Sequence, residues 1–121
     1  MPAVRRIEHV QISMPRGWET EARAFYTGVL GLPEIAGPAA CGAGGCWFET
    51  GDVKLHVGVD DDFRPAQRAR MALVVDGLDA VVATARMLGC KASEPEPLGA
   101  FTMVYVCDPF GNQLELLQPV G

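Results

Sequence analysis

Residues 101–117, FTMVYVCDPFGNQLELL, contain two apolar segments separated by Asp108-Pro109-Phe110-Gly111-Asn112. Because Asp, Pro, Gly and Asn are the residues that turns prefer, this stretch predicts a hairpin with strands over Phe101 to Cys107 and Gln113 to Leu117. Glu115 is flanked by leucines in the second strand. Since side chains alternate between the faces of a strand, its carboxylate is expected on the face opposite the apolar set.

The residues before this hairpin predict a strand followed by a helix. Arg70 to Val75 is a mainly apolar run of strand length. Leu78 to Leu88 carries apolar residues at helical spacing, and Gly89 is placed to end the helix. After this helix comes a loop rich in Glu and Pro.

The first half of the chain predicts the same order of elements. Alternation over 5–14 predicts a strand, and the apolar stripe from Glu19 to Leu30 predicts a helix. Residues 33–45 show no period and are interpreted as a loop or a frayed strand. Cys46 to Glu49 and Val53 to Val59 then predict a hairpin.

Matching positions recur at a nearly constant offset in the two halves. Gly31 and Gly89, each after a helix, are 58 residues apart, and His9 and Arg70 are 61 apart. His56 and Glu115, in the last strand of each half, are 59 apart. The pattern indicates an internal duplication within one domain over 1–121, with module one at about 5–59, a connector at about 60–68 and module two at about 69–118.

Length, composition and charge exclude several classes of protein. With 121 residues, 49% of them hydrophobic, the chain can build one core, and its net charge of −5 disfavours nucleic acid as a partner. The apolar run from Met71 to Val75 is far shorter than the roughly 20 residues of a membrane span. No secretory signal is expected because Arg5, Arg6 and Glu8 interrupt the start, so a cytoplasmic protein with reduced cysteines is predicted.

Three residues on the predicted polar strand faces form a candidate metal site. His9, His56 and Glu115 are a donor set that suits Zn, Ni, Mn, Co or Fe as the divalent ion. The alternative is that each side chain is simply solvated or hydrogen-bonded.

Arg70 and Trp47 are candidate substrate-binding residues. Arg70 cannot ligate a cation, so either it clamps an anionic substrate group or it pairs with Glu115 and keeps the site closed to metal. Trp47 either forms an aromatic wall or packs in the core.

The sequence resembles the vicinal oxygen chelate superfamily of glyoxalases, bleomycin-resistance proteins and extradiol dioxygenases. The resembling segments are 7–10 (IEHV), 25–33 (FYTGVLGLP), 45–49 (GCWFE), 55–58 (LHVG), 72–80 (ALVVDGLDA) and 108–115 (DPFGNQLE). The resemblance implies an α+β fold of two βαβββ modules that form a cup-shaped mixed sheet, commonly completed by a homodimer whose metal sites draw on both chains. The family's ligand positions match His9, His56 and Glu115, whereas a fourth position, often histidine, is Arg70 here.

Two functions from different classes follow. The first is a metal-dependent enzyme, a glyoxalase-like lyase or isomerase or a dioxygenase, that acts on a small anionic oxygenated substrate. In it Glu115 is a catalytic ligand and the loop around Cys41 to Gly45 closes over the site. The second is a metal-free drug-binding protein of the bleomycin-resistance type, and a member with neither activity is a third possibility.

Overall fold

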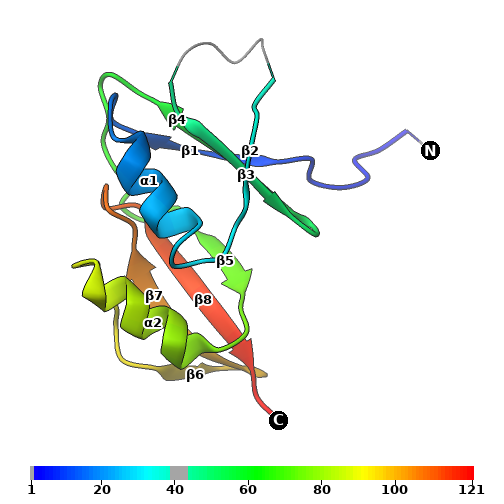
Figure 1. The fold of residues 1–121 in the computed structure, drawn as a ribbon. Helices are drawn as coiled ribbons and strands as arrows, with labels where there is room; N and C mark the ends of the chain where they lie inside the picture. Colours follow the sequence, from blue (N-terminus) through cyan, green and yellow to red (C-terminus); the bar gives the residue numbers. More distant parts are fainter. Residues whose placement is uncertain (1, 39–43) are drawn as a thin grey trace.

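The structure, a computed structural model, describes residues 2–38 and 44–121 and contains two four-stranded sheets (Figure 1). The first sheet has the strand order β1-β4-β3-β2 and the second β5-β8-β7-β6. The elements are β1 (Val10–Met14), α1 (Glu19–Tyr26), β2 (Glu34–Ile35), β3 (Cys46–Thr50), β4 (Val53–Val59), β5 (Met71–Val74), α2 (Leu78–Met87), β6 (Glu96–Leu98), β7 (Phe101–Cys107) and β8 (Gln113–Pro119).

The two sheets have the same topology, which confirms the predicted α+β fold of two βαβββ modules. β1 runs parallel to β4 with Val10 opposite Leu55, and β5 runs parallel to β8 with Met71 opposite Leu114. The remaining neighbours in each sheet are antiparallel. Each module therefore builds its own mixed sheet, and the last strand of the module lies beside the first.

Three elements differ from the sequence-based expectation. β1 begins at Val10 rather than at residue 5, since residues 2–9 are all exposed and bury no apolar face. α1 ends at Tyr26, four residues early, where the chain turns toward Gly31 with its φ of 72°. β6 was not predicted, because Glu96-Pro97-Leu98 carries no period and is held only by its pairing with β7.

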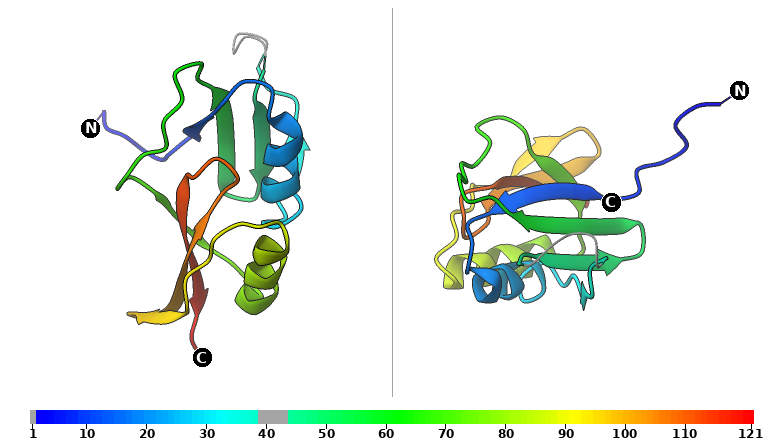
Figure 2. Two further views of the ribbon diagram at one scale, coloured as in Figure 1. Left: turned by 90° about the vertical axis from the view of Figure 1, so that its left-hand side faces the viewer. Right: turned by 90° about the horizontal axis from the view of Figure 1, so that it is seen from above.

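A single apolar core is shared by both modules. α1 packs on β3 and α2 packs on β8, and both helices lie on the same side of the molecule, while the N-terminal segment projects away from it (Figure 2). The buried cluster combines Phe25, Phe48 and Leu55 of module one with Val104 and Leu116 of module two. In the described part of the chain, no helix is long and apolar enough to cross a membrane.

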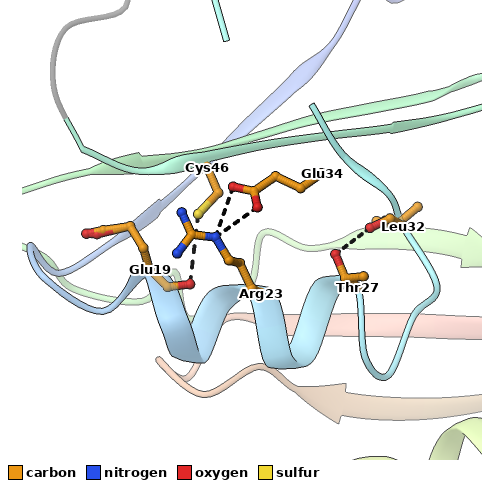
Figure 3. A network of polar contacts seen from close by, with 6 residues as sticks. All are labelled: Glu19, Arg23, Thr27, Leu32, Glu34 and Cys46. Carbon is orange, nitrogen blue, oxygen red and sulfur yellow. Dashed lines mark hydrogen bonds and ion pairs between the residues drawn. The ribbon is translucent and has the colours of Figure 1, made fainter. Parts of the chain in front are cut away.

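Polar contacts fix the end of α1 and the short strand β2 (Figure 3). Arg23 Nε donates to both oxygens of Glu34, at 2.8 and 3.1 Å, and thereby ties the helix to β2. Thr27 Oγ1 donates to the Leu32 carbonyl at 2.6 Å and closes the turn after the helix. The Cys46 thiol lies near the Glu19 carbonyl at 3.9 Å, and burial raises its pKa to about 11. Cys46 is therefore a protonated core residue.

A buried hydrogen-bond network joins the two modules. Tyr26 Oη of α1 donates to Asp108 Oδ2 at 2.6 Å, and Asn112 Nδ2 donates to the same oxygen at 2.9 Å. Asn112 Nδ2 also donates to the Ser13 carbonyl of β1 at 2.8 Å. Asp108, only 3% exposed, accepts backbone bonds from Phe110 and Asn112 on Oδ1. The predicted turn between β7 and β8 therefore also connects the two modules through hydrogen bonds.

Candidate functional site

Sheet one carries a group of three aromatic rings. The rings of Trp47 on β3 and His56 on β4 are stacked, with centroids 4.2 Å apart and planes 7° from parallel, because the two residues are paired across the strands. The His9 ring lies 5.0 Å from the indole. Burial, reinforced by nearby His9, lowers the pKa of His56 below its usual value. His56 is therefore a neutral imidazole at pH 7.

Two charged residues that the sequence analysis missed extend this group. Glu8 Oε1 lies 2.8 Å from His9 Nδ1, and Lys54 Nζ lies 3.4 Å from the other Glu8 oxygen. Because an ionised carboxylate only accepts hydrogen bonds, Nδ1 is the nitrogen of His9 that donates to Glu8, and Nε2 takes no part in this bond. Lys54 also lies 5.8 Å from the centroid of the Trp47 ring.

Strand alternation explains why Glu8 was missed. A regular strand would point Glu8 and His9 to opposite faces, but both residues precede β1 and bond to each other. Their adjacency in the sequence was the one signal available.

Sheet two carries an ion pair between Arg70 and Glu115. Arg70 Nε lies 3.2 Å from Glu115 Oε1, and its Nη1 donates to Gln113 Oε1 at 3.1 Å and to the Arg68 carbonyl at 3.3 Å. The Tyr105 ring lies beneath the guanidinium at 4.9 Å. Of the two roles predicted for Arg70, the structure shows the pairing with Glu115, whose hydrogen bond raises the pKa of Arg70 further.

The donor set of one chain does not fit a divalent metal ion. Within residues 2–38 and 44–121, no three His, Cys, Asp or Glu side chains come close enough together to hold one. His56 on β4 and His9, just before β1, both lie against the Trp47 ring, whereas Glu115 on sheet two accepts a hydrogen bond from a guanidinium. A cation beside Arg70 would be repelled, since both charges are positive.

A cavity of about 390 Å³ adjoins His9 at the junction of the two sheets. Its walls are mainly apolar, with Leu55 and Val53 of β4 on one side and Leu73 of β5 on the other. Glu8, His9, Asp52 and Lys54 supply its polar groups. Mostly apolar walls with a few convergent polar groups are typical of small-molecule sites.

The predicted site residues differ in their accessibility. The side chains of His9, Arg70 and Glu115 are 36, 30 and 21% exposed. Trp47 and His56 are only 7 and 8% exposed, so Trp47 supports the imidazoles rather than offering a free aromatic face. In the predicted closing loop, residues 41–43, which include Cys41, lie outside the described residues.

Comparisons with solved structures show close likeness over nearly the whole chain. A glyoxalase family protein from Bacillus anthracis is 36% identical, with a TM-score of 0.86 and 99% of each chain covered. TnmS3, an antibiotic binding protein from Streptomyces sp. CB03234, is 26% identical, with a TM-score of 0.68 over 97% of this chain and 100% of that one. The fosfomycin resistance protein FosX from Listeria monocytogenes is 15% identical, with a TM-score of 0.76 over 98 and 96% of the chains, and it shows the fold alone. No protein-family profile and no curated protein sequence matches.

Proposed function

The chain belongs to the glyoxalase family of the vicinal oxygen chelate superfamily, and from that premise we propose that it binds a small organic molecule without using a metal ion. The proposed binding site is the cavity beside His9. A metal-free binding function was the second of the two functions predicted from the sequence.

The observation that carries this proposal is the Arg70–Glu115 ion pair. The resemblance to the superfamily places Arg70 at a metal-ligand position where family members often have a histidine. Here its guanidinium neutralises the carboxylate that would otherwise be the anionic ligand. Neither residue of this pair lines the cavity beside His9, so the pair supports the metal-free character of the proposal, and the cavity itself supplies the ligand contacts.

The likeness to TnmS3 supports a binding role, because that protein binds an antibiotic and covers the same length of chain. The walls of the cavity suit a ligand with an apolar body, and Glu8 and Asp52 suit a cationic group on it. The homodimer expected from the resemblance remains part of the proposal. It is supported by exposed apolar residues at Ile7, Val74 and Leu98.

A metal-dependent enzyme using His9, His56 and Glu115 is the second candidate. It is favoured by the Glu8–His9 pair, since a carboxylate that holds one imidazole nitrogen leaves the other free to ligate. It also requires Glu115 to meet the histidines, from a second copy of the chain, and to exchange Arg70 for the metal.

Elemental analysis separates the two candidates. Wild-type protein, purified without metal-affinity resin and incubated with Zn, Ni, Mn, Co or Fe(II), is compared with Arg70→His and Arg70→Lys. We expect wild type and Arg70→Lys to remain essentially metal-free, and Arg70→His to approach about one ion per chain because it adds the missing imidazole. About one ion per wild-type chain, lost in both His9→Ala and His56→Ala, would establish the enzyme instead.

Ligand binding is measured on a Trp18→Phe variant, in which fluorescence reports on Trp47 beside the cavity. Bleomycin and other aromatic, cationic antibiotics are the probes. Saturable quenching that is lost in His9→Ala supports the proposal. A metal-free protein that none of these probes quenches would instead be the member with neither activity.

A further inference from the structure

A second cavity, of about 520 Å³, lies where the end of α2 meets the turn between β7 and β8. It shares no lining residue with the cavity beside His9. Cys90 and Lys91 line it next to α2, and Cys107 lines it next to the turn. Both cysteines are free and half-buried. Two thiols that the proposed function does not use therefore adjoin one cavity.

The backbone brings the two cysteines close together. Cys107 N donates to the Lys91 carbonyl at 2.9 Å, and the next residues, Ala92 and Val106, form an isolated antiparallel bridge. Cys90 therefore lies one residue from the position opposite Cys107. Burial raises the pKa of the Cys90 thiol, and the neighbouring Cys107 thiol contributes to the rise, so the two thiols are close enough to interact.

The donors around this cavity suit an ion that needs only two ligands. Within residues 2–38 and 44–121, no three His, Cys, Asp or Glu side chains are placed to hold a metal. The carboxylate of Asp108, which also lines the cavity, already accepts bonds from Tyr26, from Asn112 and from two backbone amides. Soft thiolates select Cu(I), which is stable with two of them, whereas a structural zinc ion takes four ligands. The pair of thiols therefore favours a soft monovalent ion.

We propose that Cys90 and Cys107 together bind one Cu(I) ion at this cavity. Binding forms two Cu–S bonds, breaks both S–H bonds and releases two protons to solvent, and copper keeps its oxidation state. The resulting complex carries one negative charge, which the ammonium of Lys91 on the cavity wall stabilises. The site does not rest on the proposed function, because it uses a different cavity, different residues and a different kind of ligand.

Anaerobic competition for Cu(I) with the chelator bathocuproine disulfonate tests the proposal. The coloured complex of the chelator reports how much copper the reduced protein withdraws. Cys90→Ser and Cys107→Ser each remove one proposed ligand. Cys41→Ser and Cys46→Ser are the matched controls, and Lys91→Gln removes the positive charge while it keeps both thiols. Alkylation of wild type by iodoacetamide, with and without copper, is mapped by mass spectrometry.

We expect wild type to bind about one Cu(I) per chain, and each variant that lacks a ligand to bind at least about tenfold more weakly. Cys41→Ser and Cys46→Ser should stay within about twofold of wild type, since they remove no ligand. Lys91→Gln should weaken binding by about two- to fivefold, because an exposed charge contributes modestly. In wild type, bound copper should protect Cys90 and Cys107 from alkylation, a result that does not depend on any variant.

Several results would overturn this inference. Wild type could withdraw no copper, or could bind it only between two copies of the chain, which copper-dependent association in size-exclusion chromatography would reveal. Unchanged binding in Cys90→Ser or in Cys107→Ser, or an equal loss in Cys46→Ser, would place the ion elsewhere. Cys90 packs partly against the core, so melting temperatures of all variants are measured in parallel. If Cys90→Ser fails to fold, alkylation of wild type decides, and thiols that copper leaves unprotected would refute the site.

Discussion

Replacing Tyr26 by phenylalanine removes one hydroxyl from the buried junction between the modules. That hydroxyl donates to Asp108 at 2.6 Å, and Asp108 is 3% exposed, so water cannot replace the lost donor without opening the core. A hydrogen bond to a charged group contributes about 1.5–3 kcal/mol. For 121 residues, 1 kcal/mol corresponds to about 4 °C in melting temperature, so we expect Tyr26→Phe to melt about 6–12 °C lower at pH 7.

The pH dependence of this difference tests the reasoning more sharply. Burial raises the pKa of Asp108 above its usual 3.8, and the Tyr26 hydrogen bond opposes that rise. Its removal moves the folded-state pKa further up, so the folded variant binds a proton more readily than the unfolded chain does. The destabilisation by Tyr26→Phe is therefore largest at neutral pH and shrinks as the pH falls through the raised pKa, toward the 0.5–1.5 kcal/mol, or about 2–6 °C, of a neutral hydrogen bond.

Differential scanning calorimetry from pH 7 down to pH 4 measures this effect. Other carboxylates titrate alike in both proteins, so the difference between them isolates Asp108. Tyr105→Phe, at the chain's other tyrosine, is the control and should change the stability by less than about 0.5 kcal/mol. A difference for Tyr26→Phe that does not vary with pH, or a loss equal to that of the control, would refute an ionised Asp108 as the acceptor.

Three further outcomes are expected. His56 should titrate below 6.5 by NMR, and Trp47→Leu should return its pKa toward that value by uncovering the ring. Because His56 of the unfolded chain binds a proton at a higher pH than His56 of the folded chain, the free energy of unfolding should fall as the pH drops through 6.5. An unshifted pKa of His56 would contradict this prediction. Gly37→Ala should lower the melting temperature by about 4–12 °C in a calorimetric scan, because an added Cβ would lie 2.3 Å from Trp47 Cδ1 and overpacking costs about 1–3 kcal/mol; an unchanged melting temperature would mean that the indole can move. Cys46, with a pKa of about 11, should react with iodoacetamide at pH 8 more slowly than the half-buried Cys107 in peptide mapping, and equal rates would show that β3 opens.

The fold was predictable wherever a period and a turn signal coincided. The β7–β8 hairpin and the matching offsets of His56 and Glu115 came from two-residue alternation, which tertiary structure preserves because one face is buried. β6 had no such signal, since its three exposed residues are held only by pairing with β7. The alternation over 5–14 predicts a start of β1 that is too early. Charged residues can alternate with apolar ones in a segment that pairs with no neighbouring strand.

The sequence predicts where the candidate site residues lie along the strands, but it does not predict which of their side chains contact one another. Sequence offsets matched Arg70 to His9 and Glu115 to His56. Arg70 lies just before β5 rather than in the predicted strand, and the parallel pairing of β5 with β8 brings it to Glu115. The ion pair between Arg70 and Glu115 depends on a distance of 3.2 Å, which no periodicity determines. The stacking of Trp47 on His56 likewise follows from the β3–β4 register.

The connector joins two modules that share one core, and this has a consequence for how the chain could be divided. Residues 60–70 hold no helix or strand, whereas the apolar cluster and the Tyr26–Asp108 bond both cross between the modules. The connector therefore keeps the two modules close to each other but adds no helix or strand to the fold. A chain cut within the connector would behave as a pair of complementary fragments, each exposing the apolar surface that the other covers, and the tyrosine–aspartate contact would help them recognise each other.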